Sequence, residues 1–292
     1  MTWINAVVQG LLLGGLYALF ACGLSLMFGV MRIINLAHGD IAIMGAFLTF
    51  QIAIRLSVSP FVALLPTLVV MAALGYLLQR TVLARSLRSG TLIPLLTTFG
   101  LSIVIQNGLL QAFSADVHSL GPQAGSIATA SLTISSQLSV PYFGLITMLV
   151  AVVLLGGLQT VLARTAFGRE MRATASDPDT AGLVGIPAAS VYGKATAIAV
   201  ATAALAGTFL AVRSTFDPSS GPAQLIFAFE AVVIGGLGSL WGTLAGGIVL
   251  GVAQTVGANI DPQFSILAGH LVFLVILASP RGRYLATRSA TA

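Results

Sequence analysis

Two acidic side chains stand inside apolar stretches of the sequence, and they are the residues most able to do chemistry there. Asp40 follows FGVMRIINLAHG, and Glu230 lies in FAFEAVVIGG. An ionisable group in such surroundings is costly and commonly marks a functional site. The alternative is a structural role, in which the carboxylate accepts hydrogen bonds from backbone amides freed where a helix is interrupted. Both interpretations stay open from the sequence alone.

Polar residues and glycines surround these two acids. Each of them could line a path for a solute or satisfy the backbone where a helix breaks, and Thr and Ser often bond back to their own helix. The candidates are Asn35, His38 and Gly39 near Asp40; Thr97, Thr98 and Gly100 in the apolar run 93–113, which also carries Ser102, Gln106 and Asn107; and Gly235, Gly236 and Gly238 after Glu230.

No residue pattern typical of an enzyme occurs in the sequence. HExxH, CxxC and GxSxG are absent, and Cys22 is the one cysteine. The stretch Gly185–Lys194 has the glycine and lysine of a phosphate-binding loop, but its glycines are too far apart and Ala195 follows the lysine. We therefore expect a protein without catalytic residues, cofactor, metal site or ATPase site of its own.

The composition is that of a membrane protein. Charged residues make up 7% of the chain, hydrophobic residues 57%, and the mean hydropathy is +1.01. Soluble domains carry about 25% charged residues. We expect one all-α polytopic domain over 1–292 with about eight or nine membrane segments, half-helices included. Apolar runs lie at about 6–30, 36–54, 61–79, 93–113, 142–162, 195–212, 226–237, 240–257 and 264–279.

The basic residues predict how the chain is threaded, because Arg and Lys concentrate in short cytoplasmic loops. They cluster between 80 and 88, between 164 and 172, and in the tail from 281 to 288. Placing these inside leaves only Arg55 and Arg213 outside. We therefore expect an outside N-terminus and a cytoplasmic C-terminus. The net charge of +5 is a topological signal and not a sign of nucleic-acid binding.

Two halves of the chain follow a similar order in opposite orientation. The unit 6–113 begins outside and holds a helix, a break near 35–45 and two further spans. The unit 195–279 begins inside and holds a helix, a break near 235–242 and two further spans. Matching interrupted segments in two inverted halves indicate an inverted-repeat transporter.

Two polar segments interrupt the apolar pattern. Residues 164–192 hold several charges between two long apolar runs, and Asp177-Pro178 would divide them into two short helices. On the cytoplasmic side this segment would offer a docking surface to a partner protein. Residues 114–140 form the longest outside loop, whose alternating ATASLTIS could make a short strand. That loop is a connector or a surface for an extracytoplasmic partner.

Four stretches stand out by their order and spacing. They are FGVMRIINLAHGDIAIMG (28–45), LLTTFGLSIVIQN (95–107), GREMRATASDPDTAGLVGI (168–186) and FEAVVIGGLGSLWGTLAGGIVLG (229–251). Together they resemble the branched-chain amino-acid type permeases of ABC importers, and fit the shorter of the two permease subunits that such systems usually pair. The resemblance covers nearly the whole chain, and it implies a fold like that of type II ABC importers.

The resemblance implies a subunit of the bacterial inner membrane that imports branched-chain or related amino acids. Its partners would be a sibling permease, two cytoplasmic ATPase subunits and an extracytoplasmic substrate-binding protein. Segment 164–192 would carry the coupling helices. Arg169, Arg172 and Asp177 are the candidates for polar docking contacts, and Ala173, Ala181, Gly182 and Gly185, with Gly168 before them, for close packing.

Two other functions remain open. An ion-coupled secondary transporter would use Asp40, His38 and Glu230 as a proton or sodium relay. A passive channel for a small polar solute such as urea would use the polar side chains of 93–113. Both leave the charged segment 164–192 without a role, whereas a channel driven by a separate motor protein needs such a segment.

Overall fold

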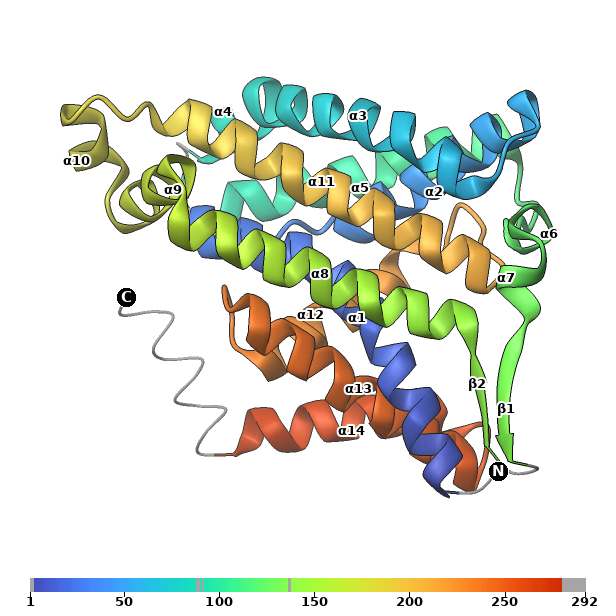
Figure 1. Ribbon diagram of the computed structural model, residues 1–292. Helices are drawn as coiled ribbons and strands as arrows, with labels where there is room; N and C mark the ends of the chain where they lie inside the picture. The colour runs from blue at the N-terminus through green and yellow to red at the C-terminus, as the bar shows by residue number, and fades with distance from the viewer. Residues whose placement is uncertain (1–2, 88–89, 91, 136–137, 280–292) are drawn as a thin grey trace.

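A computed structural model describes residues 3–87, 90, 92–135 and 138–279, and these are almost entirely helical (Figure 1). Within them, seven helices are long and apolar enough to cross a bilayer, and two further apolar helices are shorter. This confirms the all-α polytopic fold. The long helices are α1 (Trp3–Met31), α2 (His38–Leu56), α3 (Pro60–Leu78) continued through η1 (Gln79–Leu83) and α4 (Ala84–Ser86), α5 (Leu92–Phe113), α8 (Tyr142–Arg164), α11 (Ala188–Arg213) and α13 (Leu240–Ile260); the shorter ones are α12 (Gly221–Gly235) and α14 (Phe264–Ala278).

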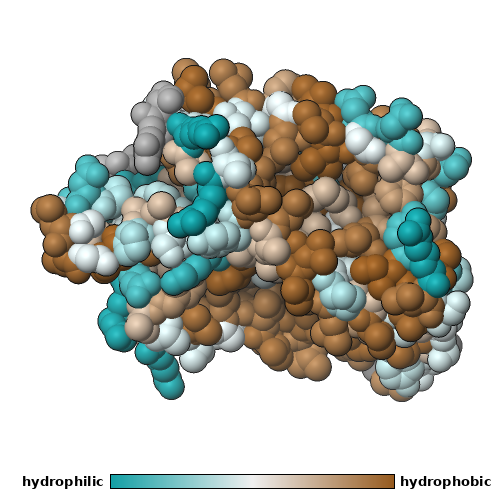
Figure 2. Space-filling model, turned by 90° about the horizontal axis from the view of Figure 1, so that it is seen from above, coloured by the Kyte–Doolittle hydropathy of each residue, from teal (hydrophilic) through white to brown (hydrophobic). Residues whose placement is uncertain are grey.

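The remaining elements lie at the two ends of the helix bundle (Figure 1). At one end are α9 (Ala166–Ser176) and α10 (Pro178–Leu183), the two short helices expected around Asp177-Pro178. At the other end are α6 (Gly121–Ala124), α7 (Ser126–Thr129) and the antiparallel strands β1 (Ser131–Ser135) and β2 (Leu138–Pro141). Figure 2 shows a broad apolar surface between two ends where hydrophilic residues gather. The basic tail from 281 to 288 lies outside the described residues.

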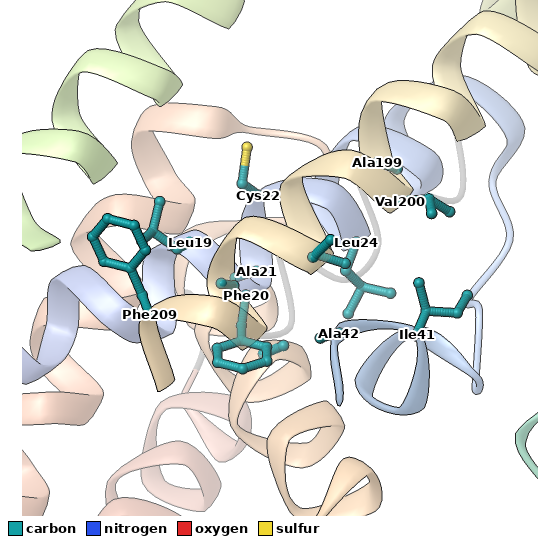
Figure 3. Packing of buried hydrophobic residues seen from close by; sticks show 14 of the residues in the cluster. Leu19, Phe20, Ala21, Cys22, Leu24, Ile41, Ala42, Ala199, Val200 and Phe209 are labelled. Atoms are coloured by element: carbon teal, nitrogen blue, oxygen red, sulfur yellow. The ribbon is translucent and has the colours of Figure 1, made fainter. Parts of the chain in front are cut away.

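Two long helices, α1 and α11, form the centre of the bundle. Both are mostly buried, whereas α5 and α8 expose most of their apolar surface, as helices in contact with lipid do. α1 packs against α13, α11, α8 and α12, and α11 packs against α3, α2 and α1. Figure 3 shows where apolar side chains of α1, α2 and α11 meet, among them Phe20, Ala42 and Val200.

Glycines bring α1 and α13 into backbone contact. A Cβ added to Gly14 would lie 2.5 Å from the Ile248 Cα, and a Cβ added to Gly247 would lie 2.7 Å from the Gly14 carbonyl oxygen. Small residues four positions apart allow such an approach, which membrane helices use because lipid offers no hydrophobic drive for association. The repeated spacing of Gly10 with Gly14 and of Gly247 with Gly251 therefore marks a helix–helix contact.

The chain turns back into the bundle after α1. Residues 32–37 are not helical, and α2 begins at His38, whose Nε2 lies 2.9 Å from the Phe20 carbonyl oxygen. At 1.5 Å per residue, Phe20 is about 16 Å from the end of α1. The second membrane helix therefore starts deep inside the bundle.

The second half contains a similar return. α11 ends at Arg213, residues 214–220 are not helical, and α12 begins at Gly221 against the start of α2. A Cβ added to Gly39 would lie 2.8 Å from the Gly221 carbonyl carbon. The two re-entrant helices α2 and α12 thus meet at their N-termini.

The break expected near 235–242 is present, but it is not the segment that corresponds to 32–37. Residues 236–239 form only a short turn from α12 to α13, in which Gly238 has a φ of 83° and packs against Gly29 of α1. The segment that corresponds to 32–37 is 214–220. Its apolar Phe216 and the absence of a glycine run make it a weaker sequence signal than Gly235–Gly242. The first break also begins earlier than expected, at 32 instead of 35.

Candidate translocation pathway and coupling surface

Side chains satisfy the backbone of the break before α2. The Oδ1 atom of Asn35 accepts a hydrogen bond from the Ala37 N–H at 3.0 Å, and the Thr98 hydroxyl accepts one from the Leu36 N–H at 3.1 Å. An unpaired N–H group inside a membrane costs several kcal/mol. Asn35 and Thr98 thus both satisfy backbone N–H groups at the break.

His38 ties the start of α2 to α1. Its Nε2–H donates to the Phe20 carbonyl oxygen, because a carbonyl can only accept. The Nδ1 atom is then a buried acceptor, with no partner among the described residues. Gly39, next in the chain, leaves the room that Gly221 occupies. Both residues therefore hold the junction between α2 and α12.

Asp40 lies at this junction and is almost fully buried. Its Oδ2 accepts a hydrogen bond from the Ser102 hydroxyl at 2.5 Å, and the Gln106 Nε2 donates to the Ser102 oxygen at 3.1 Å. Its Oδ1 has no hydrogen-bond partner in the described part of the chain. The carboxyl group packs against Gly221, where a Cβ would lie 2.7 Å from the Asp40 Cγ. Asp40 thus joins α2, α5 and α12.

Glu230 lies in a second polar cluster that the sequence did not reveal. Its Oε1 lies 2.5 Å from Nδ1 of His270 on α14, and the His270 ring stacks on Phe227 at 6.1 Å between centroids. Phe227 also contacts Tyr17, whose hydroxyl donates to Gln254 on α13. The only sequence signal was one histidine and one glutamine in apolar runs, far apart in the chain from Glu230 and Tyr17.

The structure does not connect the three ionisable groups of the expected relay. Asp40 bonds to Ser102, His38 to Phe20, and Glu230 to His270. Among the residues that the structure describes, no hydrogen bond joins two of the three. Within the described residues, the three groups therefore belong to three separate hydrogen-bonded sites.

Several other candidates lie away from the junction of α2 and α12. The Thr97 hydroxyl bonds back to the Ile93 carbonyl oxygen at 2.8 Å, and Gly100 faces open space on the outer side of α5. Gly235 packs closely against Gly242. Gly235 ends α12, and Gly236 and Gly238 belong to the turn before α13. These four glycines and Thr97 do not meet Asp40.

The helix α9 is fixed to the end of the bundle. Thr165 caps it by accepting from the Gly168 N–H at 3.2 Å, and Arg172 donates to the Leu162 carbonyl oxygen at the end of α8. A Cβ on Gly168 would lie 2.6 Å from the Leu162 Cα, so this position has no room for a side chain. Arg169 is exposed and free to meet a partner.

A cation–π contact and a cavity lie where α9 meets the helix bundle. The Lys194 Nζ lies 5.6 Å from the centroid of the Phe167 ring, which connects α9 to α11. A cavity of about 490 Å³ separates the other side of α9 from α1 and α8, with Ser25, Gln159 and Arg172 in its lining. α9 thus contacts both central helices of the fold without filling the space beneath it.

The helix α10 begins at a strong cap. The Asp177 Oδ1 accepts from the backbone N–H groups of Asp179 and Thr180 at 3.0 and 3.2 Å, and its Oδ2 accepts from the Thr180 hydroxyl at 2.5 Å. These bonds, the hydroxyl first, lower the pKa of Asp177. Ala181 is buried against the fold, so among the proposed close-packing residues it is unavailable to a partner.

Two apolar side chains stand out at the tip that follows. Leu183 and Val184 are 88% and 73% exposed, more than any other large hydrophobic residue that the structure describes. Gly182 and Gly185 on either side face open space, and Gly185 has a φ of 85°, which favours glycine. The sequence analysis missed Leu183 and Val184, although two large apolar residues in a polar loop are a signal of an interaction surface.

Comparison with known proteins places this architecture in a family. Residues 6–280 match the family model described as branched-chain amino acid transport system, permease component. The chain is 30% identical to the high-affinity branched-chain amino acid transport system permease protein BraD of Pseudomonas aeruginosa, covering 96% of this chain and 95% of BraD. No solved structure matches.

Two permeases of one bacterium, Salmonella typhimurium, are also similar. Identity to its high-affinity branched-chain amino acid transport system permease protein LivH is 29%, over 96% of this chain and 94% of LivH. Identity to its LivM permease protein is 26%, over 94% of this chain and 68% of LivM. The chain therefore belongs to the branched-chain amino acid transport system permease family, and it is a multi-pass permease subunit of an ABC importer in the inner membrane.

Proposed function

We propose that this permease forms the pathway by which branched-chain or related amino acids enter the cell, driven by ATPase subunits that bind α9 and α10. The observation that carries the proposal is the exposed apolar tip Leu183-Val184 on a charged two-helix projection. The names of BraD and LivH support the substrate class. The chain itself would hydrolyse no ATP.

The docking surface would combine charge with an apolar centre. Leu183 and Val184 would enter a cleft of an ATPase subunit, with Gly182 and Gly185 allowing close approach. Arg169 and Asp177 would supply polar contacts at the rim, where interfaces are usually polar. Arg172 and Ala173 lie behind them on α9, and Arg172 would transmit force through its bond to the end of α8.

The threading follows from the charges at the two ends. The helix α4, which holds Arg85, and η1 before it, which holds Arg80, lie toward the end that carries α9 and α10 (Figure 1). Arg164 ends α8 just before α9, and Arg169 and Arg172 are on α9 itself. The positive-inside rule assigns this end to the cytoplasm. The N-terminus of α1 and the hairpin β1–β2 would then face outward. The segment 114–140 at that end would receive the extracytoplasmic binding protein.

The units 6–113 and 195–279 would form an inverted repeat. α1 packs on α13 of the other unit, and α11 packs on α3 of the other unit. The re-entrant helices α2 and α12 meet between them, which supports a pathway at the repeat interface, where substrates of such transporters bind. Asp40, His38, Asn35, Thr98 and Glu230 are its residues in this proposal.

The second permease would be a sibling chain. Salmonella typhimurium has two permeases named for branched-chain amino acid transport, and this chain covers 94% of LivH but only 68% of LivM. The chain therefore has the length of the shorter type. A longer permease of the second type would complete the transporter, together with two ATPase subunits.

Uptake by the whole transporter in proteoliposomes tests this function. Vesicles that contain both permeases, the ATPase subunits and the binding protein are expected to accumulate leucine against its gradient only with ATP. A protonophore or sodium ionophore should leave the rate unchanged. Accumulation driven by an ion gradient without ATP would support the secondary transporter, and ATP-independent equilibration would support the passive channel.

A further inference from the structure

Asp40 carries a buried carboxylate that forms no ion pair with any residue the structure describes. It is 1% exposed, and within the described residues the one ion pair joins His270 to Glu230. An unpaired charge inside a membrane protein is strongly unfavourable unless a partner neutralises it. Of these two buried acids, Glu230 has a partner in His270 of α14, and Asp40 has no such partner in the part of the chain that the structure describes.

The surroundings of Asp40 leave one oxygen ready to accept. Oδ2 is taken by the Ser102 hydroxyl, while Oδ1 has no hydrogen-bond partner among the described residues and faces the start of α12 at Gly221. Gln106 bonds to the Ser102 oxygen and fixes the hydroxyl in its donor direction. The cluster is therefore oriented toward α12 and lacks a donor there.

An apolar cavity lies against the same two helices. It has a volume of about 290 Å³ and is lined by Ile41, Met44, Leu101, Ile105 and Val200, among others. Ile41 follows Asp40 in α2, and Leu101 and Ile105 precede Ser102 and Gln106 in α5. The volume is near the lower end of the range of small-molecule sites, about 300 Å³. The lining also includes Leu74, Leu77 and Leu78 of α3, and it does not include Asp40, Ser102 or Gln106. The cavity is therefore a neighbour of the Asp40 cluster on the same pair of helices and does not contain it.

We propose that Asp40 binds the ammonium group of the amino acid in transit, with Ser102 and Gln106 as positioning residues. An ammonium group has three donors and a positive charge, which are what Oδ1 of Asp40 lacks. This inference rests on the proposed function and adds to it a selection step in the membrane for solutes that carry a cationic amine.

Ligand-induced stabilisation of the transporter, purified without binding protein, tests the assignment. Three probes differ only in their charged groups: L-leucine, leucinamide, which keeps the ammonium, and 4-methylpentanoate, which lacks it. A ligand that binds the folded state raises its melting temperature. Leucine and leucinamide are expected to raise it by a few degrees and 4-methylpentanoate to leave it unchanged. Equal stabilisation by 4-methylpentanoate would overturn the proposal.

Substitutions test whether Asp40 is the residue that binds the ammonium group. Asp40→Asn is expected to abolish the stabilisation by leucinamide, with binding weaker by about thirtyfold or more because a buried charge pair is lost. Asp40→Glu should retain it in part. Asp261→Asn, outside the bundle between α13 and α14, is the matched control and should behave as wild type. Retention of the preference for leucinamide over 4-methylpentanoate in Asp40→Asn would also overturn the proposal.

Measurements of leucine uptake distinguish a failure of the ammonium site from a failure of the proposed importer function. In proteoliposomes with binding protein, Asp40→Asn is expected to lose leucine uptake while the binding protein still stimulates ATP hydrolysis. If wild type shows ATP-driven uptake and Asp40→Asn matches it, the ammonium site is wrong and the importer function stands. If wild type itself shows no ATP-driven uptake, the proposed function fails.

Discussion

At the scale of single residues, the buried acids show why a carboxylate inside a membrane needs a partner. Glu230 is 4% exposed and lies 2.5 Å from His270, which is on a different helix. The pair joins α12 to α14, and the stacking of His270 on Phe227 holds the imidazole in place. Removing one member of a buried pair leaves the other uncompensated, and this costs more than replacing both.

His270→Ala is therefore expected to destabilise the permease more than the double variant His270→Ala/Glu230→Gln. The loss for a fully buried pair is about 3–5 kcal/mol. Because the His270 side chain is 37% exposed, solvent screening reduces the expected loss to about 1–3 kcal/mol. Thermal unfolding of the purified transporter measures the difference. A double variant no more stable than His270→Ala would show that the charge of Glu230 is not what the histidine compensates.

The cap of α10 gives a second prediction at this scale. Asp177→Ala removes an acceptor for two backbone N–H groups, whereas Asp177→Asn keeps an acceptor oxygen of nearly equal capping strength. We expect Asp177→Ala to reduce the amount of ATPase subunit that co-purifies, and Asp177→Asn to preserve it. Equal loss in both variants would show that the charge, and not the cap, binds the partner.

The pKa of the capping residue Asp177 determines how the stability of α10, and with it ATPase binding, should depend on pH. The Thr180 hydroxyl and backbone N–H groups lower the pKa of Asp177. A carboxyl group whose pKa is lower in the folded state contributes stability above its unfolded pKa of about 3.9, and loses it as the pH falls through the folded value. Wild-type ATPase retention should thus stay constant between about pH 5 and 8 as far as this cap is concerned.

At the scale of elements, α9 and α10 form a projection that is tied to the bundle but open at its tip. Arg172 bonds to the end of α8, and Lys194 of α11 lies over Phe167. Gly182 has no atom within 4 Å of where a Cβ would lie, other than its own neighbours. A larger side chain at position 182 would therefore cause no clash within this chain. Any effect of such a substitution on transport would come from contact with a partner protein.

Gly182→Leu is expected to leave the permease folded and inserted but to uncouple ATP hydrolysis from leucine uptake, with uptake falling at least about tenfold, equivalent to about 1.4 kcal/mol of lost docking. Gly157→Leu on α8, which also has open space around it, is the matched control and should transport normally. Reconstituted vesicles measure uptake and hydrolysis together. Normal coupled uptake by Gly182→Leu would place the docking surface elsewhere.

The elements also show how far the sequence alone could lead. Each apolar run became a helix, because some 20 apolar residues have few other structures open to them in a membrane. The non-helical segment 214–220, which leads back into the bundle, could not be predicted. The composition of α11 and α12 does not show how far inside the bundle α12 begins. His270 was missed for a similar reason, since its partner Glu230 is on another helix and no local pattern links them. Leu183 and Val184 can be read in the sequence, but only the folded structure shows that their side chains are exposed.

At the scale of the whole molecule, the helices α2 and α12 meet inside the bundle, while one end of the bundle carries the charged projection of α9 and α10. Cys22 is fully buried, so cysteine labelling of introduced sites has little background. Ser176→Cys on α9 is expected to react with a membrane-impermeant maleimide only after cells are opened, and Asp116→Cys at the opposite end to react from outside. The reverse pattern would invert the proposed threading.

The proposed coupling to ATP hydrolysis depends on ATPase subunits that bind Leu183 and Val184, the tip of this projection. Co-purification of the assembled transporter carrying Leu183→Asp/Val184→Asp measures this most directly, because both side chains are exposed and their replacement leaves the packing of the bundle unchanged. Leu132→Asp, an exposed apolar residue on β1 at the other end, is the control. We predict that the double variant is inserted with its sibling permease but retains no ATPase subunits, while the control retains both. A double variant that keeps its ATPase subunits and its ATP-driven uptake would contradict the account.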